Sequence, residues 1–522
     1  MAPSHCFPTA FRLPLVARLG RSTPTPPHSR YAALALSSDG DSTRNRLGPH
    51  ITSIHVLDDD SLLNIFHLYR PVLLDKDEVR NDRNLQGGIW DRERWWYKLA
   101  QVCQRWRYLI LGSASYLQLC LPCTYGTPVA EMLAHSPSLP LVLDYIDENR
   151  VITAEEEKRI MLALGQRDRV RRIRLLMRIQ VLRKVITDID DKFPVLEFLY
   201  LEAPTKDNRD LILPGSFRAP HLRHLVLINF NIELNSPLLT TPVALITLSL
   251  QKIQPSSAFR PNDLLQRLAL MPRLETLGIH FHPPLPNSNV ERLLLDMPIT
   301  HATLPNLRWF GFGGATAYLE VFLSRMTTPL LEKFQLRFSN ESAFSVPRLL
   351  QFMSTAKNLR LTSARFEFNG WGLSVFVYPH EGAKMYALEL KVICRHLNSQ
   401  VPSVAQLFDV LSPAFSAVEH LTLSAMSPVL LEGQNEVDET QWRKLLKSFG
   451  NVKSLLVGGE LVEEVSRCLR SEDGELPLEL LPELRELSYA GKGGAFAGFV
   501  NARQVAGHPV HLVRLQSPFV LL

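Results

Sequence analysis

Apolar residues recur along the chain in a short phrase with the spacing L-x-x-L-x-L, in which alternating apolar and polar positions predict a strand. A proline usually precedes the first apolar position by two residues, as at 194–201, 220–227, 272–279, 305–312, 329–336 and 482–489. Related phrases without that proline occur at 170–175, 245–250, 418–423 and 452–457. One such unit cannot bury its apolar face alone, so the series predicts a solenoid of stacked units.

The segments between the phrases carry helix signals. Thr153 and Glu156 have the spacing of a capping box before an apolar face, and Gly165 follows as a stop signal. Asp438 marks the expected start of another helix. Three further stretches with a proline at or near one end are expected to be helical: 261–270, 347–356 and 404–411. Strands that alternate with helices predict an α/β fold with a parallel sheet on one side and helices on the other.

A different pattern precedes the repeats. Apolar residues at helical spacing occur in 57–66 and again in 98–119, which predicts a small all-α module. Residues 72–92 lack apolar periodicity and are expected to form an inserted surface loop. Residues 1–49 are rich in proline, serine and threonine, so we expect a disordered extension there. The predicted organisation is the extension at 1–49, the helical module at 50–125 and the solenoid at 135–515.

The helical module resembles the F-box, which docks onto the adaptor subunit of SCF-type (cullin-RING) ubiquitin ligases. Residues 57–66 follow the register L-P-x-E-x-L-L-x-I-F of that family, with Asp58 at the proline position and Asp60 at the glutamate position. Residues 102–107 read VCQRWR, similar to the V-C-K-x-W-R core. The insertion at 72–92 is similar to those in F-box proteins of mushroom-forming fungi. The resemblance implies a fold and docking surface made by Leu57, Leu62, Leu63, Ile65, Phe66, Val102, Cys103, Trp106 and Leu109.

The repeated phrases resemble leucine-rich repeats, but the Asn or Cys that follows the last leucine in that family is replaced, for example by Pro204 and Phe230. We therefore expect irregular repeats whose turns are held by other groups. Residues between the leucines point to the opposite face of the sheet, and Trp and Arg are frequent in binding hot spots. Arg308 and Trp309 are accordingly the predicted contact for a protein substrate. The alternative is that loops of the array cover these side chains.

Composition and charge narrow the function classes. The net charge of +5 comes from 57 basic and 52 acidic residues in a chain of 522, which predicts no strong attraction to nucleic acid or to a membrane surface. Six scattered cysteines do not form the framework of a secreted disulfide protein. No apolar run reaches the length that spans a bilayer. We expect a cytoplasmic or nuclear protein; mitochondrial import directed by residues 1–38, which contain arginines but no acidic residue, is the alternative.

No catalytic motif is evident, and we expect no enzyme activity, cofactor or metal. Cys120 and Cys123 have ligand spacing but lack a second pair, and His280 and His282 stand beside prolines, so buried thiols and loop residues are the simpler interpretations. The glycine runs at 311–314 and 491–494 match no phosphate-binding motif. The arginines between 167 and 178 predict a solvated face, with an acidic or RNA partner as the alternative.

These patterns predict an adaptor that positions other proteins rather than catalysing a reaction. Its expected partners are the adaptor subunit of an SCF-type ubiquitin ligase and an unidentified protein substrate. The first alternative is a repeat scaffold for protein–protein interaction with no ligase link, in which the helical module caps the solenoid. A second is an enzyme that uses one of the glycine loops. Exposure of apolar residues in 57–66 and 99–109 would favour docking, whereas their burial would favour the cap.

Overall fold

The computed structural model describes residues 57–71, 94–147, 150–189, 192–204, 211–241, 244–254, 259–281, 301–339, 344, 346–394, 396–425, 438–470, 479–491 and 494–515. The extension expected at 1–49, the import signal considered within it and the loop expected at 72–92 lie outside these residues. The chain divides into two compact units. The first reaches Leu121 and includes Pro128–Leu139, and the second comprises Pro122–Thr127 and the residues from Pro140 onward.

The first unit is helical. Its described helices are α1 (Asp59–Tyr69), α4 (Trp95–Ala100), α5 (Gln104–Gly112) and α6 (Val129–His135). Asp58 is the N-cap of α1, because its carboxylate accepts hydrogen bonds from the backbone N–H of Ser61 at 2.7 Å and from the Ser61 hydroxyl at 3.1 Å. These bonds favour the ionised form and hold the pKa of Asp58 below its usual value. An aspartate thus starts the helix where the family pattern has proline.

The second unit is built on one sheet, which has sixteen strands in the described part of the chain. Every pair of neighbours whose register is known is parallel except β12–β13 and β13–β14. In order across the sheet the strands are β1 (Leu121–Cys123), β2 (Leu141–Ile146), β3 (Val170–Leu176), β4 (Phe198–Glu202), β5 (His224–Ile228), β6 (Thr247–Ile253), β7 (Thr276–Phe281), β9 (Trp309–Gly313), β11 (Lys333–Ser339), β14 (Leu388–Ile393), β13 (Gly372–Tyr378), β12 (Ser363–Asn369), β15 (His420–Ala425), β16 (Ser454–Gly458), β17 (Glu486–Ala490) and β18 (His511–Arg514). Each phrase that predicted a strand overlaps one of these strands, so the mixed α/β class with a large parallel sheet is confirmed.

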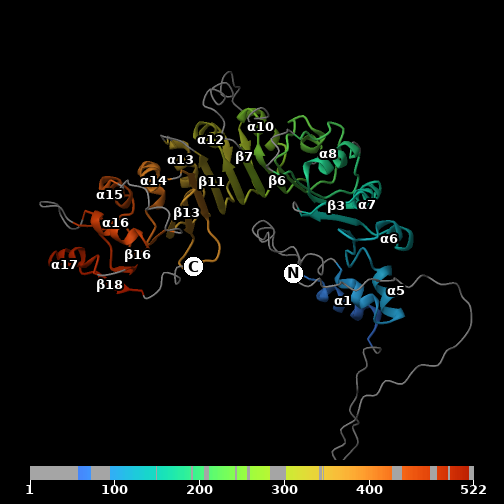
Figure 1. Ribbon diagram of the computed structural model, residues 1–522, viewed down its shortest axis with the longest axis horizontal. Helices are drawn as coiled ribbons and strands as arrows, with labels where there is room; N and C mark the ends of the chain where they lie inside the picture. Colours follow the sequence, from blue (N-terminus) through green and yellow to red (C-terminus); the bar gives the residue numbers. More distant parts are fainter. Residues whose placement is uncertain are drawn as a thin grey trace, which may run out of the picture. The chain divides into compact units, whose positions relative to one another are not determined.

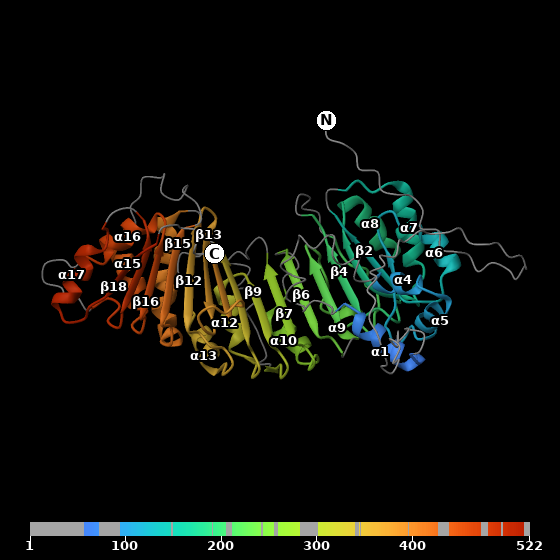
Figure 2. The ribbon, with the colours of Figure 1, turned by 90° about the horizontal axis from the view of Figure 1, so that it is seen from below.

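Helices alternate with the strands and cover one face of the sheet (Figures 1 and 2). They are α7 (Ala154–Leu164), α8 (Ile179–Asp188), α9 (Pro237–Thr240), α10 (Pro261–Leu268), α12 (Thr316–Leu323), α13 (Pro347–Thr355), α14 (Leu397–Leu411), α15 (Glu439–Lys447), α16 (Leu461–Cys468) and α17 (Ala497–Val505), with the 3-10 turn η4 (Ser412–Phe415) and a separate strand pair, β8 (Ala302–Thr303) and β10 (Met326–Thr327). The core lies between these layers. Phe310 of β9 packs on Phe322 of α12 with ring centroids 5.8 Å apart. We call the sheet face opposite these buried side chains the open face.

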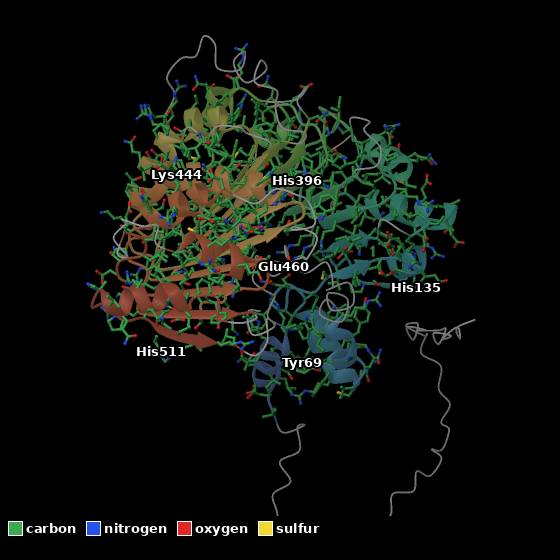
Figure 3. The ribbon with its side chains drawn as sticks, turned by 60° about the vertical axis from the view of Figure 1, so that its left-hand side comes forward. Tyr69, His135, His396, Lys444, Glu460 and His511 are labelled. Carbon is green, nitrogen blue, oxygen red and sulfur yellow. The ribbon has the colours of Figure 1, made fainter. Side chains whose placement is uncertain are left out.

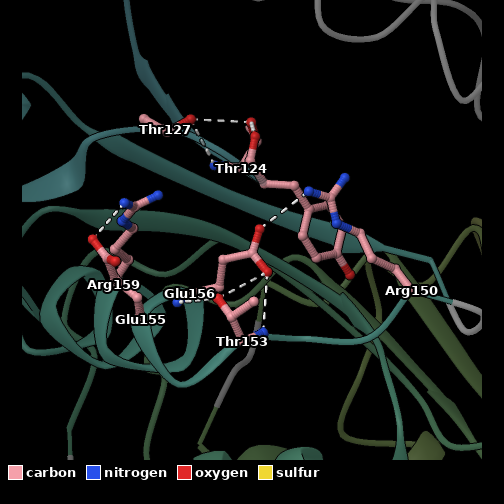
Figure 4. A network of polar contacts seen from close by, with 8 residues as sticks. Thr124, Thr127, Arg150, Thr153, Glu155, Glu156 and Arg159 are labelled. Carbon is pink, nitrogen blue, oxygen red and sulfur yellow. Dashed lines mark hydrogen bonds and ion pairs between the residues drawn. The ribbon is translucent and has the colours of Figure 1, made fainter. Parts of the chain in front are cut away.

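The capping box predicted at Thr153 is confirmed (Figure 4). The Thr153 hydroxyl accepts the N–H of Glu156 at 3.2 Å, and the Glu156 carboxylate accepts the N–H of Thr153 at 3.2 Å. The helix expected at 404–411 is longer than predicted, since α14 begins at Leu397 and contains Pro402. Burial of Leu397 and Val401 on the core side outweighs the one backbone hydrogen bond that the proline removes.

The predicted parallel sheet is interrupted at one place by antiparallel pairing. Strands β12 and β13 form an antiparallel hairpin, and β13 pairs antiparallel with β14. The turn is held by Asn369, whose side-chain oxygen accepts the N–H of Trp371 at 2.9 Å and of Gly372 at 3.0 Å. Because β14 is parallel to β11 and β12 is parallel to β15, the repeats resume on either side of this inserted hairpin.

Side-chain amides bind the backbone in the turns that precede β9 and β16. The Asn306 amide donates to the carbonyl oxygen of Pro272 at 2.8 Å, and the Asn451 amide donates to that of Ser416 at 2.7 Å. Each bond joins one repeat to the preceding repeat. After β4, where Pro204 replaces the Asn or Cys, the Asn229 amide donates to the carbonyl oxygen of Pro204 at 3.3 Å, so another group holds that turn as expected.

Two candidate interaction surfaces

The residues that carry the family resemblance in the helical unit divide by burial. Leu62, Phe66 and Trp106 form the core between α1 and α5, and the rings of Phe66 and Trp106 meet edge to face with centroids 4.8 Å apart. Leu63, Cys103 and Leu109 are half-buried, and the Cys103 sulfur accepts the N–H of Trp106 at 3.5 Å at the start of α5. These six side chains therefore shape the unit from inside or at its margin.

The other three predicted residues point to solvent. The exposed fraction is 36% for Leu57, 42% for Ile65 and 58% for Val102. Four exposed apolar or aromatic side chains on or near the same helices were not predicted: Leu68, Tyr69, Tyr108 and Tyr116 (Tyr69 is labelled in Figure 3). The sequence contained a signal for two of them, because Leu68 and Tyr69 follow Ile65 by three and four residues and so lie on the same side of α1. Exposure of this many large apolar groups in a small unit is typical of a docking surface.

Arg105 connects the start of α1 to α5. Its guanidinium donates to the backbone carbonyl of Leu57 at 2.7 Å and to the carboxylate of Asp59 at 2.7 and 3.0 Å. Because the arginine fixes the backbone at Leu57, it also fixes where that exposed side chain lies relative to α5. The arginine of the VCQRWR segment thus has a positioning role.

A depression of about 350 Å³ lies beside these residues on the helical unit. Its lining comprises Asp60, Leu63, Asn64, Ser113 and Tyr116. The Tyr116 hydroxyl donates to the side-chain oxygen of Asn64 at 3.1 Å, which ties the segment after α5 to α1. The ring of His67 lies 5.3 Å from that of Tyr116.

The second surface is the open face of the sheet. Trp309 of β9 stands in register between Thr276 of β7 and Lys333 of β11, and it is half-buried. Its indole lies across two glycines: a Cβ atom at Gly311 would overlap the ring, and one at Gly278 would lie 3.3 Å from it. Because Gly278 and Gly311 have no side chain, the indole of Trp309 can lie against the backbone of the sheet at these two positions. Arg308 is exposed and forms an ion pair with Glu332.

Charges are distributed unevenly over this sheet. Near the inserted hairpin, Glu389 is almost completely buried, pairs with Lys391 at 2.5 Å and accepts from Gln335 at 2.7 Å. Around Trp309, the aligned positions on the open face of β6, β7 and β9 carry no Asp, Glu, Lys or Arg: Thr247, Ser249, Gln251, Thr276, Gly278, His280, Trp309, Gly311 and Gly313. This region thus presents aromatic and uncharged polar groups.

Some of the arginines between 167 and 178 form ion pairs with acidic residues of the same sheet. Arg174 pairs with the buried carboxylate of Asp144 at 2.9 Å, and Arg171 pairs with Glu197 at 3.0 Å. The guanidinium of Arg172 lies 5.5 Å from the ring centroid of Phe198 on the next strand. These contacts account for three of the arginines between 167 and 178 as part of the sheet surface.

The structure gives no further support to the chemical sites considered from the sequence. Cys120 and Cys123 are buried, and His282 lies outside the described residues. Within the described ranges, no group of three His, Cys, Asp or Glu side chains is arranged to hold a metal ion. Over the same ranges, no helix has the length and apolar character needed to cross a membrane.

The fold and its two surfaces define a repeat solenoid joined to a small helical unit. No family model and no curated protein matches the sequence. Among solved structures, the chain is similar to the crystal structure of the leucine-rich repeat-containing protein LegL7 from Legionella pneumophila, with 12% sequence identity, 74% of this chain and 98% of that chain covered, and a TM-score of 0.24. That TM-score is too low to support a conclusion, and the repeat architecture follows instead from the strand order and register described above.

Proposed function

We propose that this protein is a substrate-recognition adaptor of an SCF-type ubiquitin ligase. In this function the helical unit docks onto the ligase's adaptor subunit, and the open face of the solenoid binds a protein to be ubiquitinated. The chain itself would catalyse nothing. It would raise the effective concentration of a substrate lysine near an enzyme bound elsewhere on the ligase, in the cytoplasm or the nucleus.

The observation that carries the proposal is the division of the F-box-like residues into a buried and an exposed set. Leu62, Phe66 and Trp106 form the core of the unit, whereas Ile65 and Val102 are 42% and 58% exposed at its surface. Large exposed apolar side chains of this kind are characteristic of sites that another protein covers.

The docking proposal predicts that Ile65→Ala combined with Val102→Ala weakens binding of the ligase adaptor subunit at least about tenfold, since hot-spot truncations cost 1–2 kcal/mol or more each. Both side chains are exposed, so the thermal midpoint should change little. The measurement is a titration of the purified chain with the adaptor subunit. Leu162→Ala removes a side chain of matched exposure, 40%, from the solenoid and should bind as the unaltered chain does. Equal affinity of the double variant and this control would disprove the docking proposal.

The substrate proposal predicts that Arg308→Ala combined with Trp309→Ala removes a set of client proteins, with a fall of about tenfold or more in their recovery, while the ligase subunits are retained. Gly311→Ala provides a second route to the same result, because the added methyl group displaces the indole without removing it. Arg308→Ala alone separates the contribution of the arginine, whose partner in the chain is Glu332. Quantitative mass spectrometry of co-purified proteins is the measurement, and an unchanged client list in all variants would end this assignment.

A further inference from the structure

In the described part of the chain, the large sheet has two terminal strands that differ in exposure. All three residues of β1 are buried, whereas His511 and Arg514 at the ends of β18 are exposed and the residues between them are half-buried (β18 is labelled in Figures 1 and 2, and His511 in Figure 3). Within the same residues, β17 is the one neighbour of β18. A terminal strand of this kind presents backbone groups that can pair with a further strand.

The backbone of β18 is arranged to accept such a strand. Its pairing with β17 is parallel, and the N–H groups of His511 and Leu515 donate to carbonyl oxygens of the β17 segment at 2.8 and 2.9 Å. In a parallel ladder alternate residues of a strand bond to the same neighbour, so His511, Val513 and Leu515 bond to β17. Leu512 and Arg514 therefore direct their N–H and C=O groups to the open edge.

The last repeat carries positive charge at this edge. The sequence from Leu487 to Leu522 contains no aspartate or glutamate. Arg514 lies in register with Tyr489, donates to the carbonyl oxygen of Gly491 at 3.2 Å and forms no ion pair with a described residue. Its guanidinium is therefore available to a carboxylate from outside the chain.

A buried cation in the same repeat adds to this charge. Arg503 of α17 is fully buried, and its Nη2 donates to the carbonyl oxygens of Pro482 at 2.9 Å and Leu484 at 3.2 Å. Its Nε and Nη1 have no hydrogen-bond partner among the described residues. Because no described carboxylate forms an ion pair with it, Arg503 leaves a positive potential that favours an anionic group near the last repeat.

We propose that β18 binds an extended acidic segment of a client protein, which adds to the sheet as a further strand. The backbone of the segment would bond to Leu512 and Arg514, and one of its carboxylates would lie at the Arg514 guanidinium. Leu512 is in register with the buried Leu487, so an apolar residue opposite Leu512 would extend the core by one strand. This site is separate from the docking and substrate surfaces proposed above and extends the proposed function.

The charge of the edge favours an acidic segment over a second copy of this chain. Antiparallel pairing of two β18 strands about a two-fold axis would bring together two strands that each carry His511 and Arg514 and no carboxylate. Like charges placed opposite each other destabilise paired strands. An acidic segment meets no such repulsion.

The first test measures hydrogen exchange of Leu512 and Arg514 in the full chain, resolved to single residues by mass spectrometry. The probe is a nine-residue synthetic peptide in which threonine alternates with valine and aspartate in turn. We expect both amides to exchange rapidly in the free chain and at least about tenfold more slowly with saturating peptide. The same peptide with every backbone nitrogen methylated keeps the carboxylates but cannot donate to the edge, so it should give no protection.

The other possible occupants would give different patterns of exchange at Leu512 and Arg514. Slow exchange in the free chain at every protein concentration would show that another segment of the chain covers the edge, and slow exchange only at high concentration would show pairing of two copies. Either pattern would overturn the proposed occupant, as would rapid exchange that the peptide does not change. These measurements need no ligase adaptor subunit, so their failure is distinguishable from failure of the docking proposal.

Exchange of the charges tests the assignment of Arg514. In titrations followed by fluorescence anisotropy, Arg514→Glu should weaken binding of the aspartate peptide about tenfold and should bind a peptide with lysine at the aspartate positions more tightly than the unaltered chain does. Arg360→Glu makes the same change at an exposed arginine of another repeat and should bind both peptides as the unaltered chain does. If the two variants had equal affinities for both peptides, the proposed site would be refuted.

Discussion

Replacement of Gln400 by glutamate is expected to lower the free energy of unfolding by about 3–5 kcal/mol near neutral pH, the range for an uncompensated buried charge. Gln400 lies in α14 and is fully buried. Its amide nitrogen donates to the carbonyl oxygens of Asn369 at 2.8 Å and Cys394 at 2.9 Å. One side chain thus joins the end of β12 and the end of β14 to the helix that covers them. A carboxylate of the same shape would face two acceptors with no proton to donate.

The loss should grow as pH rises. Burial opposite two carbonyl oxygens raises the pKa of the introduced carboxyl in the folded state above its ordinary value of about 4.3. Between those two pKa values the native state binds more protons than the unfolded state, so the free energy of unfolding falls with increasing pH. Below about pH 4 the neutral acid still donates one hydrogen bond, and the loss should shrink to about 1–2 kcal/mol.

Urea unfolding followed by circular dichroism at about pH 7 and about pH 4 checks this expectation, with the model-peptide pKa of glutamate lying between them. Gln400→Met is the matched control, because it has similar length, removes both donors and adds no charge. It should lose about 1–3 kcal/mol at both pH values, once the pH dependence of the unaltered chain is subtracted. If the glutamate and methionine variants were equally stable at both pH values, Gln400 would not stand opposite the two carbonyls as described.

The repeat strands could be predicted because their cause is local. Each phrase places leucines at positions that must be buried together, and a proline before it marks the turn, so the strand follows without knowledge of its neighbours. The inserted hairpin also has a local signal. Apolar residues alternate at Ala364, Phe366 and Phe368, and an Asn-Gly pair follows, which is typical of a hairpin turn. Its position between β11 and β15 could not be predicted, because that depends on pairing between residues far apart in the chain.

The sequence predicted which residues belong to the candidate sites, but it did not predict which of their side chains are exposed. Ile65 and Phe66 are neighbours in the same apolar pattern, yet Phe66 meets Trp106 and Ile65 is exposed, and only the position of α5 decides between them. The outward direction of Trp309 followed from its spacing. The position of the glycines beneath it did not, because Gly278 is brought there by the register between β7 and β9.

Truncation of Trp106 to alanine is expected to destabilise the helical unit by about 3–5 kcal/mol, the usual cost of removing a buried aromatic side chain. Trp106 is 9% exposed, and it is the residue of α5 whose ring contacts Phe66 of α1. Loss of that contact removes much of the core between the two helices. Hydrogen exchange measured by mass spectrometry should therefore show faster exchange in peptides from α1 and α5.

Tyr108→Ala is the matched control for this prediction, because it removes an aromatic side chain that is 71% exposed from the same helix. It should change the free energy of unfolding by no more than about 0.5 kcal/mol. Equal exchange rates in the Trp106 and Tyr108 variants would contradict the assignment of Trp106 to the core.

Trp106→Phe then separates packing from docking within the same residue. Phenylalanine keeps an aromatic ring beside Phe66 and leaves a smaller cavity, so we expect a loss of about 1–2 kcal/mol instead of the full cost. Because Trp106 is buried, its substitutions should affect binding of the ligase adaptor subunit only through the folded fraction of the helical unit. Trp106→Phe should therefore bind as the unaltered chain does, whereas Ile65→Ala with Val102→Ala should be folded and deficient in binding. Weak binding by a fully folded Trp106→Phe variant would instead place the tryptophan in the docking contact itself.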